Sequence, residues 1–346
     1  MPLTVPDLRI EQFNVEIAGP CNLQCVTCPQ AKINGGRERD FRVMMTLEEF
    51  RKVLDDAYQY RPRDRAMCIS LHGSGEPTLN RSLPEIIRYA KSKGDTYVSF
   101  FTHANNLTPA LSQQVIAAGV NEVTVSLIGY NRETCNQSMV GGDFDRVMGH
   151  IRAFQEILRE GNYPSSKINT RHLTLDFAKR EWEVGEYRRN IIGPLGVEAE
   201  IWLQHNWDGR FVTLTSSREE MARERGLTRR SCGRPHANFL EVRAGGVNEH
   251  RLAVVACAIV LGRDSLGTLG HLDTQTIAEV VASSRYEELR RSHDEKEFNG
   301  TFCEGCDYLY PDLQEVLVWS NKPGRKVGQS QTARQLVYPE ATPVTV

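Results

Sequence analysis

The sequence predicts an α/β fold in which a parallel sheet is followed by a smaller module. Between residues 10 and 205, short apolar segments alternate with segments that have the apolar spacing of amphipathic helices. This alternation stops near residue 206, where a polar stretch leads into an Arg- and Glu-rich segment at 218–230. A regular β-then-α order implies parallel strands joined by right-handed crossovers, and a barrel or partial barrel satisfies that arrangement.

Six strands and four helices are expected in the first part of the chain. The strands are expected at 13–17, 67–71, 97–101, 122–128, 168–177 and 199–203. The helices are expected at 46–58, 83–91, 109–118 and 144–158. Thr46 is a suitable N-cap because acidic residues fill the turn that follows it. An active site on such a sheet is expected at the C-terminal ends of the strands.

The second part of the chain reads as a hairpin followed by a helix. Its strands are expected at 239–242 and 252–257 around a Gly245-Gly246 turn, and its helix at 276–291. The expected division of the chain is 1–205, 206–310 and a tail, 311–346. Because the end of the tail is rich in Pro, Gly, Gln and Thr, we expect a surface wrap or partial disorder there.

The composition excludes several classes of protein. With a formal net charge of −2, the chain lacks the excess of basic residues that is typical of proteins that bind nucleic acid. The first twenty residues lack the plan of a signal peptide, and no apolar run approaches the length of a membrane span. The sequence therefore predicts a cytoplasmic protein that binds neither nucleic acid nor membrane.

Nine cysteines in such a chain favour metal or redox chemistry over disulfides. Seven fall into two sets, which are Cys21, Cys25 and Cys28, and Cys232, Cys257, Cys303 and Cys306. Three thiols within eight residues can converge on one metal centre but cannot pair off among themselves. Zinc would need a fourth N or S ligand close by, whereas an iron–sulfur cluster can be held through three irons. Buried thiols or a zinc knuckle remain the alternative.

The spacing CxxxCxxC, placed where a first strand should end, resembles the signature of the radical S-adenosylmethionine enzymes. The resemblance implies that Cys21, Cys25 and Cys28 hold a [4Fe–4S] cluster whose free iron is chelated by S-adenosylmethionine. It also implies reductive cleavage to methionine and a 5′-deoxyadenosyl radical, which abstracts hydrogen from an unactivated C–H bond. A flavodoxin or ferredoxin-type protein is the implied electron donor.

A glycine-rich loop follows the second expected strand and reads His72-Gly73-Ser74-Gly75-Glu76-Pro77. Its glycines allow a ligand to approach the backbone, and its carboxylate can accept hydrogen bonds from a cationic amine. The loop resembles the family's GGEP motif, with Ser74 in place of the first glycine. The resemblance implies that Ser74, Gly75, Glu76 and Pro77 hold the amino group of S-adenosylmethionine.

Two later strand ends resemble the rest of that cofactor site. Thr102 and Asn105 match a Thr-Asn pair that lines the site in relatives, and Ser126 matches a ribose-contacting position. Loop capping by Asn105 and a satisfied strand hydroxyl at Ser126 are the alternatives. Thr27 departs from the pattern, because many relatives place a bulky residue there against the adenine.

The second cysteine set, with its hairpin and helix, resembles the twitch module of some radical S-adenosylmethionine enzymes. The resemblance implies a partial (β/α)6 TIM-like barrel with a small C-terminal α+β twitch domain. It further implies an auxiliary [4Fe–4S] cluster on Cys232, Cys257, Cys303 and Cys306, although four thiolates also suit zinc. Such a cluster either transfers electrons or staples the small domain together.

The size and cysteine layout resemble a subgroup that contains the butirosin-pathway dehydrogenase and the aminoglycoside epimerases. The resemblance implies hydrogen abstraction from a carbinol carbon of a sugar-like or aminocyclitol small molecule, giving a ketone, in antibiotic or other secondary-metabolite biosynthesis. Epimerisation is the alternative, and its hydrogen donor would be Cys135 or, less favourably, Cys68. Buried structural roles are the alternative for both thiols.

Peptide modification is a further possibility, but a first strand by residue 13 leaves no room for a leader-binding domain. A non-catalytic zinc or scaffold protein would leave the glycine-rich loop unexplained. Arg171, His205 and Arg210 are candidate substrate groups that could hold a hydroxyl or accept its proton. Surface salt bridges and a capped loop are the alternatives for these side chains, and Trp207 is expected to pack between the domains.

Overall fold

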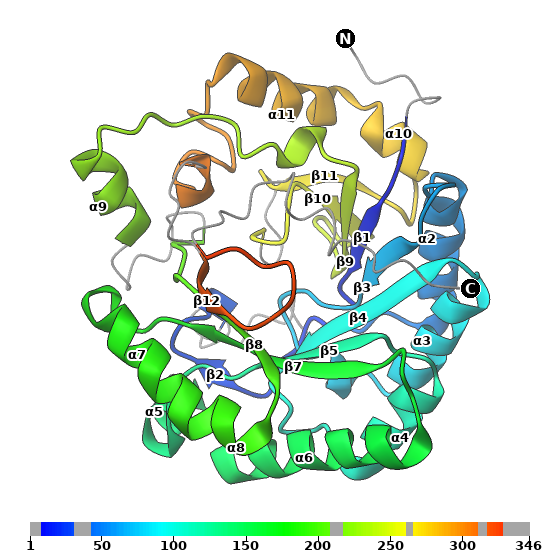
Figure 1. The fold of residues 1–346 in the computed structure, drawn as a ribbon. Coiled ribbons are helices and arrows are strands. Elements are labelled where there is room, and N and C mark those ends of the chain that lie inside the picture. The colour runs from blue at the N-terminus through cyan, green and yellow to red at the C-terminus, as the bar shows by residue number, and fades with distance from the viewer. Residues whose placement is uncertain (1–7, 31–42, 208–216, 261–265, 311–316, 328–346) are drawn as a thin grey trace.

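The computed structural model describes residues 8–30, 43–207, 217–260, 266–310 and 317–327. A single ten-stranded sheet runs in the order β11-β10-β9-β1-β3-β4-β5-β7-β8-β12. Its central strands are β1 (Gln12–Val15), β3 (Met67–Ser70), β4 (Thr96–Thr102), β5 (Glu122–Ser126), β7 (Lys167–Leu173) and β8 (Glu198–Trp202). All five pairings among these six strands are parallel, and the sheet curves into a partial barrel (Figure 1). The predicted α/β fold is therefore confirmed.

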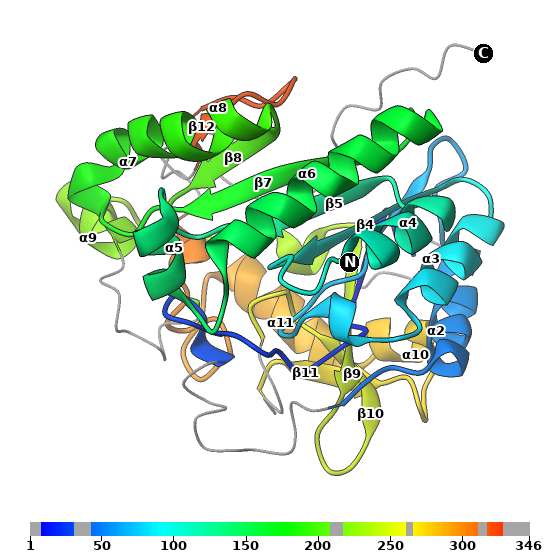
Figure 2. The same ribbon diagram turned by 90° about the horizontal axis from the view of Figure 1, so that it is seen from below.

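The four predicted helices lie on the outer, convex side of this sheet (Figures 1 and 2). They are α2 (Leu47–Gln59), α3 (Leu83–Ser92), α4 (Pro109–Ala117) and α6 (Phe144–Gly161). Thr46 caps α2 in a reciprocal capping box with Glu49, as its position predicts. Helix α2 buries Phe50, Val53 and Leu54 because its apolar residues recur at helical spacing.

Several elements were not predicted, and most of them are short. They are β2 (Gln24–Cys25), β6 (Met139–Val140), α5 (Arg132–Ser138), α7 (Arg180–Tyr187), a π-helical turn (Arg188–Ile192), α8 (Gly193–Leu195) and α9 (Ser217–Glu224). Two-residue strands carry no periodicity that a sequence pattern could reveal. Strand β7 ends at Leu173 rather than near 177, because Asp176 caps a 3-10 turn at Phe177–Lys179.

The C-terminal hairpin is present, but its sheet is continuous with the barrel. Strand β9 (Phe239–Gly245) pairs in parallel with β1 and antiparallel with β10 (Arg251–Val255), and β11 (Thr268–His271) extends the edge. The single helix expected at 276–291 is two helices, α10 (Ile277–Val281) and α11 (Ser284–Glu295). Ser283 separates them because its side chain caps α11.

Part of the expected tail belongs to the barrel sheet. Strand β12 (Leu317–Ser320) pairs antiparallel with β8, so the prediction of a surface wrap or disorder is wrong for these residues. The next residues lie against the amino ends of two barrel strands. Asn321 accepts a hydrogen bond from Ala199 N–H at 2.6 Å, and Lys322 Nζ donates to Glu122 at 2.9 Å. Residues 328–346 lie outside the described part of the chain.

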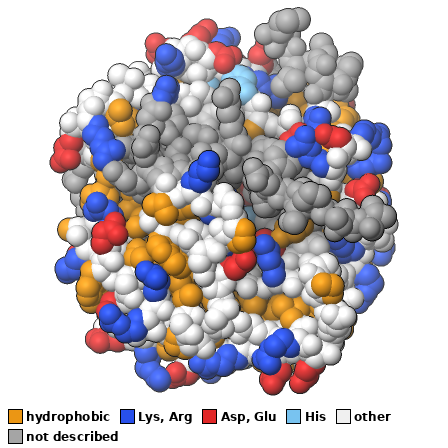
Figure 3. Space-filling model, in the orientation of Figure 1, with side chains coloured by type: hydrophobic (Ala, Val, Ile, Leu, Met, Phe, Trp, Pro, Cys, Tyr) orange, Lys and Arg blue, Asp and Glu red, His pale blue; other side chains and the backbone are white. Residues whose placement is uncertain are grey.

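Basic and acidic side chains are interspersed on the face shown in Figure 3, as a net charge near zero leads one to expect. In the described part of the chain, no helix combines the length and the apolarity that crossing a membrane requires.

We expect the ion pairs of Glu122 to make stability fall in acid. Burial acts to raise the pKa of Glu122, but Lys322, Lys167 and the Tyr97 hydroxyl outweigh it and lower the pKa from 4.5 to about 2. A lowered folded pKa contributes stability above about pH 4.5, on the order of 3 kcal/mol, which is lost as the pH falls toward 2. Denaturant unfolding at pH 7, 4 and 3 measures this loss of stability. Glu122→Gln should flatten this dependence, whereas Glu198→Gln, at the more exposed start of β8, should not.

Candidate functional site

The first cysteine set lies on a loop held at the C-terminal end of β1. Strand β2 pairs with β6, with Cys25 opposite Met139, and Val26 N–H donates to the carbonyl oxygen of Ser138 at 2.8 Å. Cys28 N–H donates to the carbonyl oxygen of Cys25 at 3.1 Å, which closes a tight turn. All three cysteines are half-buried. The unpredicted β2–β6 pair is therefore what fixes this loop.

The three thiols influence one another. Burial raises the pKa of Cys21 to about 12, and Glu76 and Cys28 add to the rise. Burial also raises the pKa of Cys25, with further contributions from Cys28 and Cys21. Glu76 N–H also donates to the carbonyl oxygen of Pro20 at 2.9 Å, so the glycine-rich loop that carries Glu76 lies beside the first cysteine set.

The glycine-rich loop packs against the end of β1 without room for side chains at its glycines. A Cβ on Gly75 would overlap the carbonyl oxygen of Ala18, and a Cβ on Gly73 would overlap Glu16. Ser74 donates from both its backbone N–H and its hydroxyl to Glu16 Oε2, each at 2.6 Å. The loop is therefore held rigidly next to the cysteines.

Glu76 is buried, and its carboxylate is occupied by partners from this chain. Its Oε1 accepts hydrogen bonds from the Thr78 hydroxyl at 2.5 Å and the Thr102 hydroxyl at 2.6 Å. Its Oε2 accepts from His103 N–H at 3.0 Å and lies 3.4 Å from His103 Nε2. These bonds join the loop after β3 to the end of β4, so the Glu76 side chain serves first to shape the site. Pro77 follows as the first residue of a 3-10 turn, Pro77–Leu79.

Two other predicted cofactor residues differ in whether their side chains already make hydrogen bonds within the protein. Asn105 is buried, and its Oδ1 accepts a hydrogen bond from Asp143 N–H at 2.8 Å, as in the loop-capping alternative. Ser126 is half-buried at the last position of β5, and its hydroxyl makes no hydrogen bond within the described residues. Of the two side chains, only that of Ser126 is available to a ligand without breaking an internal bond.

The segment after β8 links the first cysteine loop to the second. Trp207 Nε1 donates to the carbonyl oxygen of Thr27, between Cys25 and Cys28, at 3.0 Å. Asn206 N–H donates to the buried carboxylate of Asp307 at 2.9 Å. His205 lies between the rings of Trp207 and Tyr308, at centroid distances of 4.6 and 5.3 Å. His205 is thus placed between the two cysteine sets, and Trp207 contacts the loop that carries the first of them.

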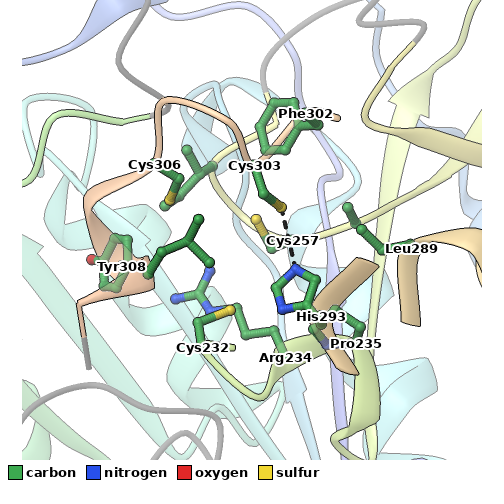
Figure 4. A pocket seen from close by; sticks show the side chains of 13 residues that line it. Cys232, Arg234, Pro235, Cys257, Leu289, His293, Phe302, Cys303, Cys306 and Tyr308 are labelled. Atoms are coloured by element: carbon green, nitrogen blue, oxygen red, sulfur yellow. Dashed lines mark hydrogen bonds between the residues drawn. The ribbon is translucent and has the colours of Figure 1, made fainter. Parts of the chain in front are cut away.

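The second cysteine set lines one pocket, which we name the four-cysteine pocket. Its wall includes Cys232, Cys257, Cys303 and Cys306, and Figure 4 shows the four side chains around the same space. The space measures about 360 Å³, counting its opening to solvent. Burial raises the pKa of Cys303 and Cys306 well above the ordinary value of a thiol, and neighbouring cysteines add to both rises. Loading a metal group here would therefore release protons.

The chemistry of the four-cysteine pocket fits an anionic metal cluster. Arg234 reaches its wall and is only 6% exposed, yet its Nε has no hydrogen-bond partner among the described residues. A buried guanidinium requires an anion nearby, and four thiolates carrying iron and sulfide would supply one. No set of three His, Cys, Asp or Glu side chains in the described ranges is arranged to hold a single metal ion. Four thiolates suit either an iron–sulfur cluster or one zinc ion, and the buried cation is the feature that favours the cluster.

The remaining predicted substrate-binding and hydrogen-donor residues do not lie together in one site. Arg171, on β7, forms an ion pair with Glu200 at 3.0 Å and lies over the ring of Phe101, inside the barrel. Cys135 is only 2% exposed on α5, and burial raises its pKa to about 12. Cys68 lies near the start of β3, at the end of the barrel away from the first cysteine set. Arg210 lies outside the described residues.

A buried charged network next to the glycine-rich loop was missed. Arg243, on β9, donates to Glu16 at 3.0 Å and to the carbonyl oxygens of Ala258 and Val260 at 2.8 and 2.9 Å. Glu241 accepts a hydrogen bond from Asn14 Nδ2 at 2.9 Å. The available signal was the set of polar residues at every second position within two otherwise apolar strands.

The first part of the chain is similar to a known family. The family model described as the Radical SAM superfamily matches residues 15–169. Residues 15–169 of this chain are a radical SAM domain. The domain runs from the last residue of β1 to the first residues of β7 and includes the first cysteine set and the glycine-rich loop.

Curated relatives with this domain carry out different reactions. A probable GTP 3′,8-cyclase of Methanococcus maripaludis is 30% identical over 149 residues, which cover 43% of this chain and 47% of the relative. An AdoMet-dependent heme synthase of Methanosarcina barkeri is 31% identical over 156 residues, covering 45% and 40%. The matched region therefore spans less than half the length of these relatives.

The similarity to solved structures covers most of the chain. BtrN in complex with AdoMet and 2-DOIA has a TM-score of 0.54 at 15% identity, covering 86% of this chain and 92% of that one. Native anSMEcpe with bound AdoMet has a TM-score of 0.59 at 12% identity, covering 94% of both chains. At these identities the likeness concerns the fold, and it confirms the TIM-like arrangement of the barrel.

Proposed function

We propose that this radical SAM enzyme is a dehydrogenase that oxidises a carbinol carbon of a sugar-like or aminocyclitol small molecule to a ketone. The observation that carries the proposal is the four-cysteine pocket, joined through residues 205–207 to the three-cysteine loop of the radical SAM domain. Two redox centres in one chain suit a reaction that removes both hydrogen and electrons from its substrate. Secondary-metabolite biosynthesis is the proposed context.

Cys21, Cys25 and Cys28 would hold a [4Fe–4S] cluster that leaves one iron for S-adenosylmethionine, and Cys232, Cys257, Cys303 and Cys306 would hold an auxiliary one in a twitch domain (206–310). When bound, the first cluster and S-adenosylmethionine supply a 5′-deoxyadenosyl radical. The backbone of Ser74 and Gly75 would receive the amino group of S-adenosylmethionine, because the Glu76 carboxylate is occupied. Ser126 would offer its uncommitted hydroxyl to the ribose.

The substrate would lie inside the barrel, near the C-terminal strand ends. Arg171 reaches this interior with its guanidinium between Phe101 and Trp202, at 4.7 and 5.4 Å from their ring centroids. A guanidinium held by Glu200 and flanked by aromatic rings can orient hydroxyl groups of a polar ligand. An external flavodoxin or ferredoxin-type donor would reduce the first cluster.

Epimerisation is the other outcome that the test must resolve. It needs a hydrogen donor beside the substrate radical, and a thiol is suited because its S–H bond is weak. Cys135 is buried in the helix layer and Cys68 lies at the opposite end of the barrel, so neither is placed for that role. The positions of these two thiols favour dehydrogenation.

The test is product analysis by mass spectrometry after anaerobic turnover in deuterated buffer with a panel of aminocyclitols and glycosides, following 5′-deoxyadenosine in parallel. Loss of two hydrogens from a substrate supports the proposal. Gain of one carbon-bound deuteron would replace it with epimerisation. About eight irons per chain are expected for two clusters, and zinc with little iron would refute the two-cluster assignment.

Gly75→Ala is expected to weaken binding of S-adenosylmethionine at least tenfold. The added Cβ would overlap backbone atoms of Ala18 and Gly19, so the glycine-rich loop must move away from the cysteines. Isothermal titration with the reconstituted enzyme measures the change. Gly185→Ala, where a Cβ meets no atom within 4 Å in helix α7, is the matched control and should leave affinity unchanged. Equal affinity in both variants would remove the loop from the proposed cofactor site.

A further inference from the structure

Arg234 and His293 lie on the wall of the four-cysteine pocket, and neither has a part in the function proposed above (Figure 4). Arg234 follows Cys232 by two residues and begins a 3-10 turn, Arg234–His236. His293 comes from α11, near the end of that helix. Both side chains are almost fully buried, at 6% and 2% exposure.

Arg234 brings a permanent positive charge to a pocket lined by four thiols. Its guanidinium carbon lies 5.0 Å from the centre of the Tyr308 ring. Within the described ranges, no carboxylate forms an ion pair with Arg234, and its Nε has no hydrogen-bond partner. A buried cation is costly unless an anion compensates it, so its natural counter-charge is that of the thiolate-bound cluster.

His293 points a ring nitrogen at one of the four sulfurs. Its Nε2 lies 3.5 Å from Cys303 Sγ, the contact drawn in Figure 4. Its Nδ1 lies 3.0 Å from Ser231 Oγ, which accepts a hydrogen bond from Gly233 N–H at 3.0 Å. The hydroxyl proton of Ser231 is still available, so this hydroxyl can donate to Nδ1. The ring then carries its proton on Nε2, where it donates to the sulfur of a Cys303 thiolate.

We propose that Arg234 and His293 raise the reduction potential of the cluster in the four-cysteine pocket, so that it accepts an electron from the substrate rather than only holding the C-terminal module together. The inference rests on the proposed function. Reduction adds negative charge to a site that already carries four thiolates. A buried cation and an N–H donor to sulfur both stabilise that added charge, and net charge and hydrogen bonding to sulfur are what set cluster potentials.

The electron balance of the proposed oxidation requires such an acceptor. The carbinol carbon gives one hydrogen atom to the 5′-deoxyadenosyl radical, forming 5′-deoxyadenosine. Formation of the ketone then releases the hydroxyl proton to solvent and one electron. Trp207 bonds to the first cysteine loop and Asn206 bonds to Asp307, next to Cys306, so the four-cysteine pocket is joined to the radical SAM domain by direct contacts.

The test is a redox titration followed by electron paramagnetic resonance, in the full-length chain with Cys21, Cys25 and Cys28 all replaced by alanine. Only the auxiliary cluster then contributes to the signal. Arg234→Gln and His293→Phe are each expected to lower the equilibrium constant for one-electron reduction at least tenfold, a shift of about 59 mV. Arg234→Lys, which keeps the charge, should shift it less than Arg234→Gln. Arg291→Gln removes the same charge from an exposed position on α11 and should shift it little.

Unchanged potentials in both Arg234→Gln and His293→Phe, with about four irons retained, would overturn this inference and leave the two-cluster function standing. Loss of those irons in either variant would also count against it, because that side chain would then be a structural support of the site. Little iron in the triple-alanine chain itself would instead refute the auxiliary cluster, and with it the proposed function.

Discussion

Replacing Cys25 with alanine is expected to abolish formation of 5′-deoxyadenosine from S-adenosylmethionine. A cluster held by three cysteines has no spare protein ligand, and Cys25 is fixed by the β2–β6 pairing in the middle of the loop. The iron content should fall from about eight to about four per chain, because the four-cysteine pocket does not involve this residue. Anaerobic chromatography of the nucleoside product and a colorimetric iron assay measure both changes.

Cys68→Ala is the matched control, since Cys68 belongs to neither cysteine set and lies at the other end of the barrel. It should retain both the iron and the activity. Formation of 5′-deoxyadenosine at an undiminished rate in Cys25→Ala would show that the cluster does not sit on this loop. Equal loss of iron in the two variants would point instead to general misfolding.

Arg243→Met is expected to destabilise the protein by about 3–5 kcal/mol, the cost of leaving a buried charge without its partner. Arg243 is 3% exposed and lies within 3.0 Å of Glu16 and 3.4 Å of Glu241, both of them buried. The guanidinium also holds the carbonyl oxygens of Ala258 and Val260, close to Cys257. The substitution should therefore loosen the glycine-rich loop and the four-cysteine pocket together. Denaturant unfolding measures the first effect, and iron content measures the second.

Adding Glu16→Gln to Arg243→Met separates charge from packing in a double-mutant cycle. Recovery of a large part of the lost stability is expected, because the second change removes one of the two unpaired carboxylates. Arg243→Lys should be intermediate, since a lysine keeps the charge but cannot reach the same set of acceptors. A loss below about 1 kcal/mol in Arg243→Met would show that solvent or relaxation compensates the buried acids.

The tail residues illustrate where prediction from the sequence failed. The composition at the end of 311–346 led us to expect a surface wrap or partial disorder, yet Leu317–Ser320 is a strand that pairs with β8. A four-residue strand is too short to show a period, and its stability comes from β8 and from Lys322, which reaches Glu122 at 2.9 Å. Such a segment is defined by partners that lie more than a hundred residues away in the chain.

The functional residues divide in a similar way. CxxxCxxC at Cys21–Cys28 and the loop at 72–77 were recognisable because their residues are close together in the chain and each type suits one kind of chemistry. The pairing of Arg243 with Glu16 was not recognisable, because it depends on β9 lying parallel to β1, a contact across 227 residues. The hydrogen bonds that the Glu76 carboxylate accepts from Thr78, Thr102 and His103 were likewise visible only in the structure.

The alternation of strands and helices, the two cysteine sets and the radical SAM resemblance could all be recognised before the structure was known. These follow from local spacing, which is legible without knowing what each residue touches. The tertiary structure alone decided that the C-terminal hairpin continues the barrel sheet, that β12 returns to it, and that Arg234 and His293 line the four-cysteine pocket. Those contacts depend on which strands become neighbours, and that choice is made by burial of side chains across the whole chain.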